Sequence, residues 1–378
     1  MPKHRLPILN DMKVFFAAGL LAVLAMGCAT SPPLDPSAGL PELPVALSLL
    51  VTGDTGRRPS MTRHLQKQIS VARGMESEDR RQPADALLLL GDNFYWKGLE
   101  RHEVDQRIRV NLVRPYCRFV SLDGPRSAEV RSACDRSQHS RPPVPIYALL
   151  GDHDYDSPES PTLERGVIPE FIPNWHMPAG LVEVIEVGAG VSLVMLDSIA
   201  LAAGADVAPL VRALASSQGP WRILAVHEPV GLARLGGSGL MAQRRHHRET
   251  VLSAIRAAGV TVQLVLSGEE HNLQIIEMAE PEVVLQVVAG SGARVRELRT
   301  DNPDARFTRA QLGFARVDLL GTGARQELVV SIFTTGTFPL FDRGAPELAA
   351  RWAISSRGAA RDLLDAALPD AASAERQP

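Results

Sequence analysis

Five segments of the sequence place carboxylate or imidazole side chains directly after an apolar run. In chain order they read Gly53-Asp54-Thr55-Gly56, Gly91-Asp92-Asn93-Phe94-Tyr95, Gly151-Asp152-His153-Asp154, His227-Glu228-Pro229 and Gly268-Glu269-Glu270-His271. One Gly-Asp pair after a strand is an ordinary turn, and one histidine is more often structural than a ligand. Five such segments in succession have more weight than one turn or one histidine. Together they supply carboxylate oxygens and a few imidazoles, which are the ligands that Fe, Mn, Mg and Zn use. The pattern predicts a metal centre.

The runs before these segments have the composition of buried strands. The strands that the pattern predicts include 45–52, 84–90, 144–150, the runs ending before His227 and Gly268, and others near 283–288, 313–320 and 326–333. Two more are joined at Gly188–Gly190, and helices are predicted near 60–77, 206–217 and 243–258. Continuous apolar strands that alternate with helices predict an α/β fold with sheets covered on both faces. Ligands bind beyond the carboxyl ends of strands in such folds, which is where the polar segments fall.

The composition limits the classes of partner. The chain has 378 residues, a formal net charge of −3 and 5% aromatic residues. Nucleic-acid binders need a basic surplus to hold phosphate backbones and often aromatic platforms to stack bases, and this chain has neither. We therefore expect no nucleic-acid partner. Separately from this argument, we expect the protein to be a monomer.

The N-terminus predicts export. The apolar stretch Val14–Gly27 follows Lys3, Arg5 and Lys13, and it is too short to span a bilayer comfortably but suits a signal peptide. It ends in "LAMGC", which resembles a bacterial lipobox with Cys28 as the lipidated residue. We expect a lipoprotein of the bacterial cell envelope that touches the membrane only through this anchor. Cleavage by ordinary signal peptidase and a retained membrane anchor are the alternatives.

The domain organisation follows from composition. We predict a signal peptide at 1–28, a mobile Pro-rich tether at 29–44 and a catalytic-type domain at 45–340. The Ala-rich segment 341–378 is predicted to form a helix and then a disordered tail. Cys117 and Cys134 remain after Cys28, and in an exported protein they are expected to pair.

The order and wording of several motifs resemble a known family. "GDNFY", "GDHDY", "VMLDS", "VHEPV" and "HNLQ" occur in this order in the chain. Over roughly residues 47–335 the chain resembles the calcineurin-like metallophosphoesterases, and among them the purple (tartrate-resistant) acid phosphatases. The resemblance implies a four-layer α/β/β/α sandwich with a two-metal centre at the strand ends. It also implies hydrolysis of phosphomonoesters by in-line attack of a metal-activated water, with phosphodiesters as the alternative substrates.

The resemblance also implies a role for individual residues. The first metal, Fe in the family, would be held by Asp54, Asp92, Tyr95 and His271. The second, a divalent Fe, Mn, Mg or Zn ion, would be held by Asp92, which bridges the two, and by Asp152, His227 and Glu269. His153 matches the histidine beside the leaving group, with Asp154 as its expected partner. Glu270 occupies the variable position between two ligands and is expected to point elsewhere.

Two positions depart from the family pattern. The family has Gly-Asn-His-Asp and Gly-His-x-His, whereas this chain has Asp152 in place of the Asn and Glu269 in place of the first His. The formal charge of the centre then falls from about +2 to about 0, which weakens the attraction for a phosphate dianion. Three readings follow: a working oxygen-rich site, a site with only the first metal, or a non-catalytic metal-binding or scaffold lipoprotein.

Other polar residues have weaker signals. His246 and His247 are expected to belong to a charged surface at the start of a helix. His176 either contacts substrate from a loop or has no role in the site. We expect Trp175 to serve packing and Asp197 to support the core below the metals.

Overall fold

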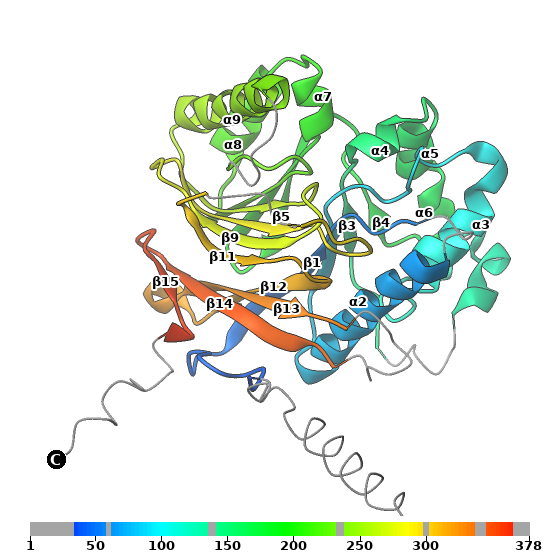
Figure 1. The fold of residues 1–378 in the computed structure, drawn as a ribbon, viewed down its shortest axis with the longest axis horizontal. Helices are drawn as coiled ribbons and strands as arrows, with labels where there is room; N and C mark the ends of the chain where they lie inside the picture. Colours follow the sequence, from blue (N-terminus) through cyan, green and yellow to red (C-terminus); the bar gives the residue numbers. More distant parts are fainter. Residues whose placement is uncertain are drawn as a thin grey trace, which may run out of the picture. The chain divides into compact units, whose positions relative to one another are not determined.

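The computed structural model describes residues 34–57, 62–134, 141–231, 238–297, 302–336 and 345–365. Two β-sheets pack face to face, with helices on the outer face of each (Figure 1). The predicted α/β class and the four-layer α/β/β/α sandwich are confirmed.

The first sheet has eight strands and is mixed. Its order is β15 (Ala360–Asp362), β14 (Glu347–Ser355), β13 (Glu327–Thr334), β12 (Gly313–Leu320), β1 (Val45–Thr52), β2 (Ala86–Leu89), β3 (Ile146–Ala148) and β4 (Trp175–His176). Strands β1 to β4 run parallel, and β12 to β15 are antiparallel to their neighbours. The parallel half brings the carboxyl ends of β1, β2 and β3 to one edge.

The second sheet has seven strands. Its order is β11 (Ala305–Arg309), β9 (Leu273–Glu277), β10 (Val283–Ala289), β8 (Val262–Ser267), β7 (Trp221–Ala225), β6 (Val191–Leu196) and β5 (Val182–Gly188). Strands β6, β7, β8 and β10 are parallel. The predicted strands and the hairpin at Gly188–Gly190 are confirmed, and the sequence did not predict β4, β9 or β11.

The helices follow the strands that they cover. They are α2 (Thr62–Arg81), α3 (Val104–Ile108), α4 (Asp152–Tyr155), α5 (Ser160–Gly166), α6 (Ile168–Phe171), α7 (Ser198–Ala202), α8 (Ala208–Ser216) and α9 (Ser238–Ala258). The three predicted helices correspond to α2, α8 and α9. Within the described residues no helix is long and apolar enough to cross a membrane.

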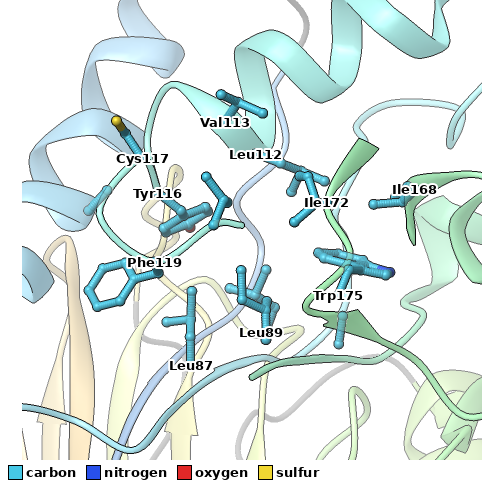
Figure 2. Close-up of a cluster of buried hydrophobic side chains, with 14 of the residues drawn as sticks. Leu87, Leu89, Leu112, Val113, Tyr116, Cys117, Phe119, Ile168, Ile172 and Trp175 are labelled. Atoms are coloured by element: carbon cyan, nitrogen blue, oxygen red, sulfur yellow. The ribbon is translucent and has the colours of Figure 1, made fainter. Parts of the chain in front are cut away.

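Three apolar layers hold the elements together. Side chains alternate along β1, so Leu49 and Val51 enter the layer between the sheets while Leu50 faces the layer under α2. That outer layer also takes Tyr116 and Phe119 from the segment after α3 (Figure 2). On the second sheet, a separate cluster packs the strands against α8 and α9. Together the buried layers fix the strand ends that carry the polar residues.

The predicted C-terminal helix is wrong. Glu347–Ser355 forms β14, which pairs along the whole of β13. Trp352 and Ile354 enter the layer between the sheets, whereas Ala353 packs on the other face. Alanine favours a helix locally, but the open edge of β13 offers backbone hydrogen bonds and an apolar face that outweigh this preference. The domain therefore extends to β15 rather than ending at residue 340, and residues 366–378 lie outside the described part of the chain.

The predicted mobile tether is wrong for residues 34–44. The Arg351 guanidinium donates hydrogen bonds to the carbonyls of Pro36, at 2.8 Å, and Ala38. Leu40 and Leu43 pack against the cluster that holds Ala353. A Pro-rich segment can lie in a fixed path when a buried donor pairs with its free carbonyls. Residues 1–33, with the predicted signal peptide and Cys28, lie outside the described residues.

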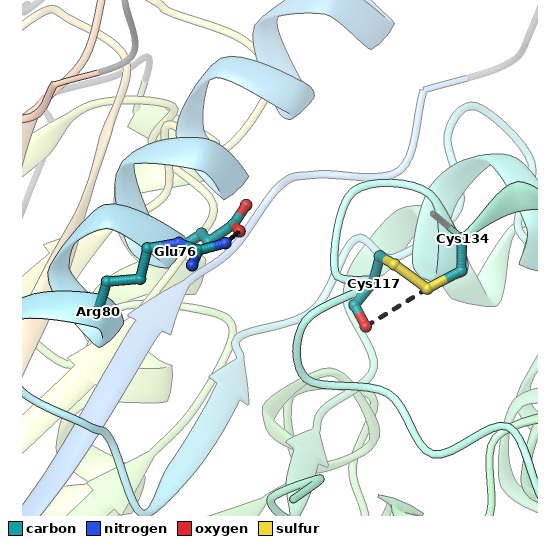
Figure 3. The surroundings of a disulfide bond; sticks show 4 residues. All are labelled: Glu76, Arg80, Cys117 and Cys134. Atoms are coloured by element: carbon teal, nitrogen blue, oxygen red, sulfur yellow. Dashed lines mark hydrogen bonds and ion pairs between the residues drawn. A yellow bond between two sulfur atoms is a disulfide. The ribbon is translucent and has the colours of Figure 1, made fainter. Parts of the chain in front are cut away.

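The expected cysteine pairing is confirmed. Cys117 and Cys134 form a disulfide with a Cα–Cα distance of 5.2 Å, near the helix α2 that carries the Glu76–Arg80 ion pair (Figure 3). Both cysteines are buried in the outer apolar layer. The bond joins the segment after α3 to the turns that follow it, in a part of the chain with little regular structure.

Candidate metal centre

The predicted ligands come together where the parallel strands of both sheets end. Asp54 follows β1, Asp92 follows β2 and Asp152 follows β3, while His227 follows β7 and Glu269 follows β8. Ligand atoms of Asp54, Asp92 and His227 lie within 4.8 Å of one another, and so do those of Asp152, His227 and Glu269. The carboxyl ends of strands from two sheets therefore form one cluster.

The loops that carry the ligands have an unusual backbone. Asp54, Asp92, Glu269 and His271 all have positive φ, between 52° and 67°. A side chain in this region costs free energy and persists only where surrounding contacts impose it. Here the Asp54 amide donates to the Gly91 carbonyl at 3.0 Å, and the Glu269 amide donates to Asp54 Oδ2 at 3.0 Å. The first hydrogen bond joins two ligand loops of the first sheet, and the second joins the loop after β1 to the loop after β8 in the second sheet.

One side of the cluster contains Asp54, Tyr95 and His271. The Tyr95 hydroxyl lies 2.9 Å from both Asp54 Oδ1 and His271 Nε2, and the latter two atoms are 3.1 Å apart. All three side chains are buried. A carboxylate, a phenol and an imidazole nitrogen converge within hydrogen-bond distance, as ligands of one ion would.

The other side is centred on His227. Its Nε2 lies 3.4 Å from Asp152 Oδ1 and 3.6 Å from both Asp92 Oδ1 and Glu269 Oε2. Its Nδ1 lies 2.7 Å from the Leu90 carbonyl, which can only accept, so Nδ1 carries the proton. This tautomer leaves the Nε2 lone pair for a metal, the usual arrangement of a metal-binding histidine.

Several buried atoms of the cluster, His271 Nδ1 among them, lack hydrogen-bond partners among the described residues. Two of these atoms, Asp92 Oδ2 and His227 Nε2, lie among the carboxylates of the cluster. Buried polar atoms without partners are costly and rare in native proteins. A cation between the carboxylates would satisfy both atoms, so the residues present fit a metal centre.

The electrostatics without a cation are unfavourable. Burial raises the pKa of Asp92 well above its usual value, and the nearby charges of Asp54 and Asp152 add to the shift. For His227, burial lowers the pKa, but the carboxylates of Asp92, Asp152 and Glu269 outweigh it and raise the pKa well above the ordinary value. The cluster therefore retains protons that a bound metal would displace.

Comparison with known proteins identifies the family. The sequence pattern described as "Calcineurin-like phosphoesterase" matches residues 47–273, more than half of the chain. The chain belongs to the calcineurin-like phosphoesterases. The family predicted from the sequence is thereby confirmed, and its members' metal-dependent hydrolysis of phosphoesters agrees with the acidic cluster at the strand ends.

Individual proteins resemble the chain in sequence or in fold. The chain is 23% identical to human tartrate-resistant acid phosphatase type 5 over 337 residues, which covers 80% of this chain and 92% of that protein. Purple acid phosphatase PPD1 from yellow lupin (Lupinus luteus) seeds superimposes with a TM-score of 0.52 at 14% identity, over 85% of this chain and 55% of that one. GAP50, described as the anchor in the inner membrane complex of Plasmodium, gives 0.54 at 16% identity, over 77% and 85%. These two structures share the fold.

The expected pairing of His153 with Asp154 is wrong. Asp154 is fully buried and accepts hydrogen bonds from the backbone amides of Asn93, Phe94 and Gly151 at 2.9–3.1 Å. His153 Nδ1 instead lies 2.8 Å from the Trp96 carbonyl and 3.3 Å from Asp156 Oδ2. Asp154 thus supports the ligand loop of this phosphoesterase, while Asp156 is the carboxylate beside His153.

The extra carboxylate at Glu269 has a basic neighbour. Glu269 Oε1 lies 3.5 Å from a terminal nitrogen of Arg244 on α9, while its Oε2 faces His227. Glu270 is fully buried and forms an ion pair with the same Arg244, so it points away from the metal cluster as expected. In this part of α9 the sequence drew attention only to His246 and His247, and sequence reasoning missed Arg244.

The first side of the cluster also has an unforeseen neighbour. Arg57 is fully buried, and its guanidinium carbon lies 3.6 Å from the centre of the Tyr95 ring. None of its nitrogens has a hydrogen-bond partner among the described residues. Burial lowers the pKa of Arg57, and the attraction of Tyr95, Asp54 and Asp92 opposes this shift. The arginine follows Asp54 closely in the sequence, but nothing there marked it as a neighbour of Tyr95.

The remaining candidates divide between surface and core. His246 is exposed, but His247 is 2% exposed, so the expected charged surface is wrong for His247. His176 Nε2 lies 3.1 Å from Glu183 Oε2, and Trp175 packs in the outer apolar layer as expected.

Asp197 accepts hydrogen bonds from the Ala200 amide at the start of α7 and from Tyr155 and Arg165. Asp197 therefore has a supporting role.

A cavity of about 300 Å³ adjoins the His227 side of the cluster. Its lining combines metal-site residues with side chains from α7 and α9. The lining residues are Asp152, Ile199, Ala202, Ala203, His227, Glu228, Leu240, Gln243, Arg244 and Glu269. A cavity of this size holds a small ligand, so it gives a substrate a way to the cluster.

Proposed function

We propose that the protein is an acid-phosphatase-like phosphomonoesterase with a two-metal centre, Fe at the first site and a divalent Fe, Mn, Mg or Zn ion at the second. The observation that carries the proposal is the convergence of the ligand set at one sheet edge. Asp54, Tyr95 and His271 would hold the first ion. Asp152, His227 and Glu269 would hold the second, with Asp92 between them.

Bound metal ions would polarise the phosphate ester and lower the pKa of a water molecule. The chain's own part is to place groups around the ester. The Trp96 carbonyl accepts from His153 Nδ1, which leaves Nε2 as the atom that can give a proton to the leaving oxygen. Asp156 Oδ2 lies 3.3 Å from Nδ1 and helps to hold the imidazole ring in this orientation.

The proposal includes an exported, lipid-anchored and monomeric protein of the bacterial cell envelope. The "LAMGC" sequence at Cys28 supports the anchor, and the Cys117–Cys134 disulfide supports an oxidising compartment. Radiolabelled fatty acid incorporated into the wild-type chain and absent from a Cys28→Ser variant would confirm the anchor. Equal labelling of both chains would contradict it.

The deciding experiment measures metal content and turnover together. Purified full-length protein is loaded separately with Fe, Mn, Mg or Zn, analysed for bound metal and assayed with an aryl phosphate. The Asp92→Asn variant, which loses the shared carboxylate, is the blank. We expect two metals per chain and a rate that falls by at least about a thousandfold in the blank, since the electrostatic term in such sites is large.

The alternative is a catalytically impaired metal-binding or scaffold lipoprotein on the same fold. It predicts one metal or none and no rate above the blank with any ion. The circular dichroism of Asp92→Asn must match that of the wild type, so that a loss of activity reports the site and not the fold.

A further inference from the structure

The cavity beside the metal cluster has an acidic wall. Asp152, Glu228 and Glu269 all line it. These three carboxylates repel a phosphate dianion that enters the cavity. The repulsion is stronger than in bulk water because the local dielectric constant is lower. Among the described lining residues, Arg244 is the only basic side chain besides His227.

Arg244 is held in a fixed position. It is 6% exposed and forms an ion pair with Glu270, which is fully buried. Because Glu270 is anchored in the loop after β8, the guanidinium cannot follow the free rotamers of a surface arginine. Because the guanidinium is already ordered, its side chain loses little further conformational entropy when it binds an oxyanion.

The hydrogen-bonding capacity of Arg244 is not used up. Its contact with Glu269 Oε1 is 3.5 Å, long for a hydrogen bond, and its Nε is buried with no partner among the described residues. A guanidinium has five donors in a fork that matches phosphate oxygens. The donors that remain therefore suit the oxygens of a phosphoryl group in the cavity.

We propose that Arg244 binds the phosphoryl group of the substrate and offsets part of the negative charge that Asp152 and Glu269 add to the second metal site. The inference rests on the proposed function, because it assumes a phosphate ester at the metal centre. Glu270 is then a positioning residue that holds the guanidinium toward the cavity. The apolar side chains of Ile199, Ala202 and Leu240 leave room for the organic part of the ester.

The test uses inorganic phosphate as the probe, on the full-length metal-loaded protein. Metal content, the Kd of phosphate by calorimetry, and kcat and KM for an aryl phosphate are measured for the wild type, Arg244→Gln and Arg244→Lys. The matched control is Arg248→Gln, an arginine of the same helix that pairs with Glu280 and does not line the cavity.

We expect Arg244→Gln to bind phosphate at least about tenfold more weakly with unchanged metal content, since a charge-assisted hydrogen bond is lost. Arg244→Lys retains the positive charge but lacks the forked guanidinium, so its affinity for phosphate should lie between those of the wild type and Arg244→Gln. Arg248→Gln should stay within about twofold of the wild type.

The inference is overturned if Arg244→Gln retains its metals and binds phosphate as the wild type does, because the ion pair with Glu270 then serves only to join α9 to the loop. Loss of metal from this variant also overturns it, by assigning Arg244 to the metal site. If Arg244→Gln fails to fold, Arg244→Lys decides in its place, and wild-type affinity there overturns the inference. A wild type that binds neither metal nor phosphate instead refutes the proposed function.

Discussion

Asp152 and Glu269 add two carboxylates to a site that must attract a phosphate dianion. The structure shows that these carboxylates are unequal. The Asp152 side chain is about half exposed; its partial burial acts to raise its pKa, but the hydrogen bond and charge of His227 outweigh this and lower the pKa. The two carboxylate oxygens of Glu269 face different basic groups, one His227 and the other Arg244. At the scale of single residues, the departure from the family pattern is therefore partly neutralised by neighbours.

Restoring the family residues tests this balance. The double substitution Asp152→Asn with Glu269→His removes two formal negative charges and leaves Arg244 in place. We expect the calorimetric Kd of inorganic phosphate to tighten by at least about tenfold, because the attraction for the dianion rises in a site of low dielectric. Unchanged or weaker phosphate binding would show that the carboxylates are already balanced by their own metal.

Asp154 provides a second prediction at this scale. Its carboxylate accepts three backbone hydrogen bonds in the interior, so Asp154→Ala should lower the free energy of unfolding by about 3 kcal/mol or more. Asp156→Ala is the control, because Asp156 is exposed and should change stability by less than about 0.5 kcal/mol while slowing turnover. Urea unfolding distinguishes them, and equal stability losses would contradict the assignment.

His247 makes stability depend on pH. Burial lowers its pKa from 6.5 to about 4, so between these values the unfolded state binds a proton that the folded state does not. Stability should therefore fall as the pH drops from 6.5 to 4, by about 3 kcal/mol from this residue. His247→Leu should remove this part of the loss when unfolding is compared at pH 7 and pH 4. The same pH dependence in both proteins would exclude His247 as its source.

At the scale of elements, the loops after β1 and β2 are locked together by a close backbone approach. The Tyr95 amide donates to the Gly56 carbonyl at 2.6 Å, and the Gly56 amide donates to the Asp92 carbonyl at 3.3 Å. A Cβ on Gly56 would lie 1.4 Å from the Asn93 carbonyl oxygen. Only glycine permits this contact, and the contact sets the separation between the ligands that the two loops carry.

Gly56→Ala should therefore force the two loops apart. We expect loss of bound metal by elemental analysis and a lower unfolding midpoint, because the clash is with backbone and cannot be relieved by a side-chain rotation. Gly166→Ala, at the end of α5, is the control: a Cβ there has no neighbour within 4 Å, and stability should stay equal or rise slightly. Wild-type metal content in Gly56→Ala would refute the argument.

At the scale of the whole molecule, the two ends of the described chain complete the first sheet. Arg351 on β14 holds the segment before β1 through the Pro36 and Ala38 carbonyls. Trp352 and Ile354 fill the layer between the sheets. The fold therefore includes both the Pro-rich segment and the Ala-rich one, and neither can be treated as a linker.

Truncation tests this extent. A fragment of residues 35–365 should be soluble and should unfold cooperatively. The fragment 35–340, which ends where the sequence alone placed the boundary, should aggregate, because it exposes the edge of β13 and an apolar face. Size-exclusion chromatography and thermal unfolding compare the two fragments. Equal unfolding midpoints would show that β14 and β15 contribute no stability.

The sequence by itself determined the central strands and the placement of the ligands. A buried parallel strand is a local apolar run, and the Gly-Asp or His that ends it is adjacent in the chain, so both signals are short-range. For this reason Asp54, Asp92 and His227 were predicted to converge, and they do.

Only the tertiary structure decided the contacts across elements. His153 pairs with Asp156 because α4 brings positions three apart onto one face, whereas adjacent positions such as Asp154 point elsewhere. Arg244 reaches Glu269 because α9 packs near the end of β8, and β14 forms because β13 offers an open edge. These contacts join residues through packing rather than chain proximity, and packing overrides local propensity.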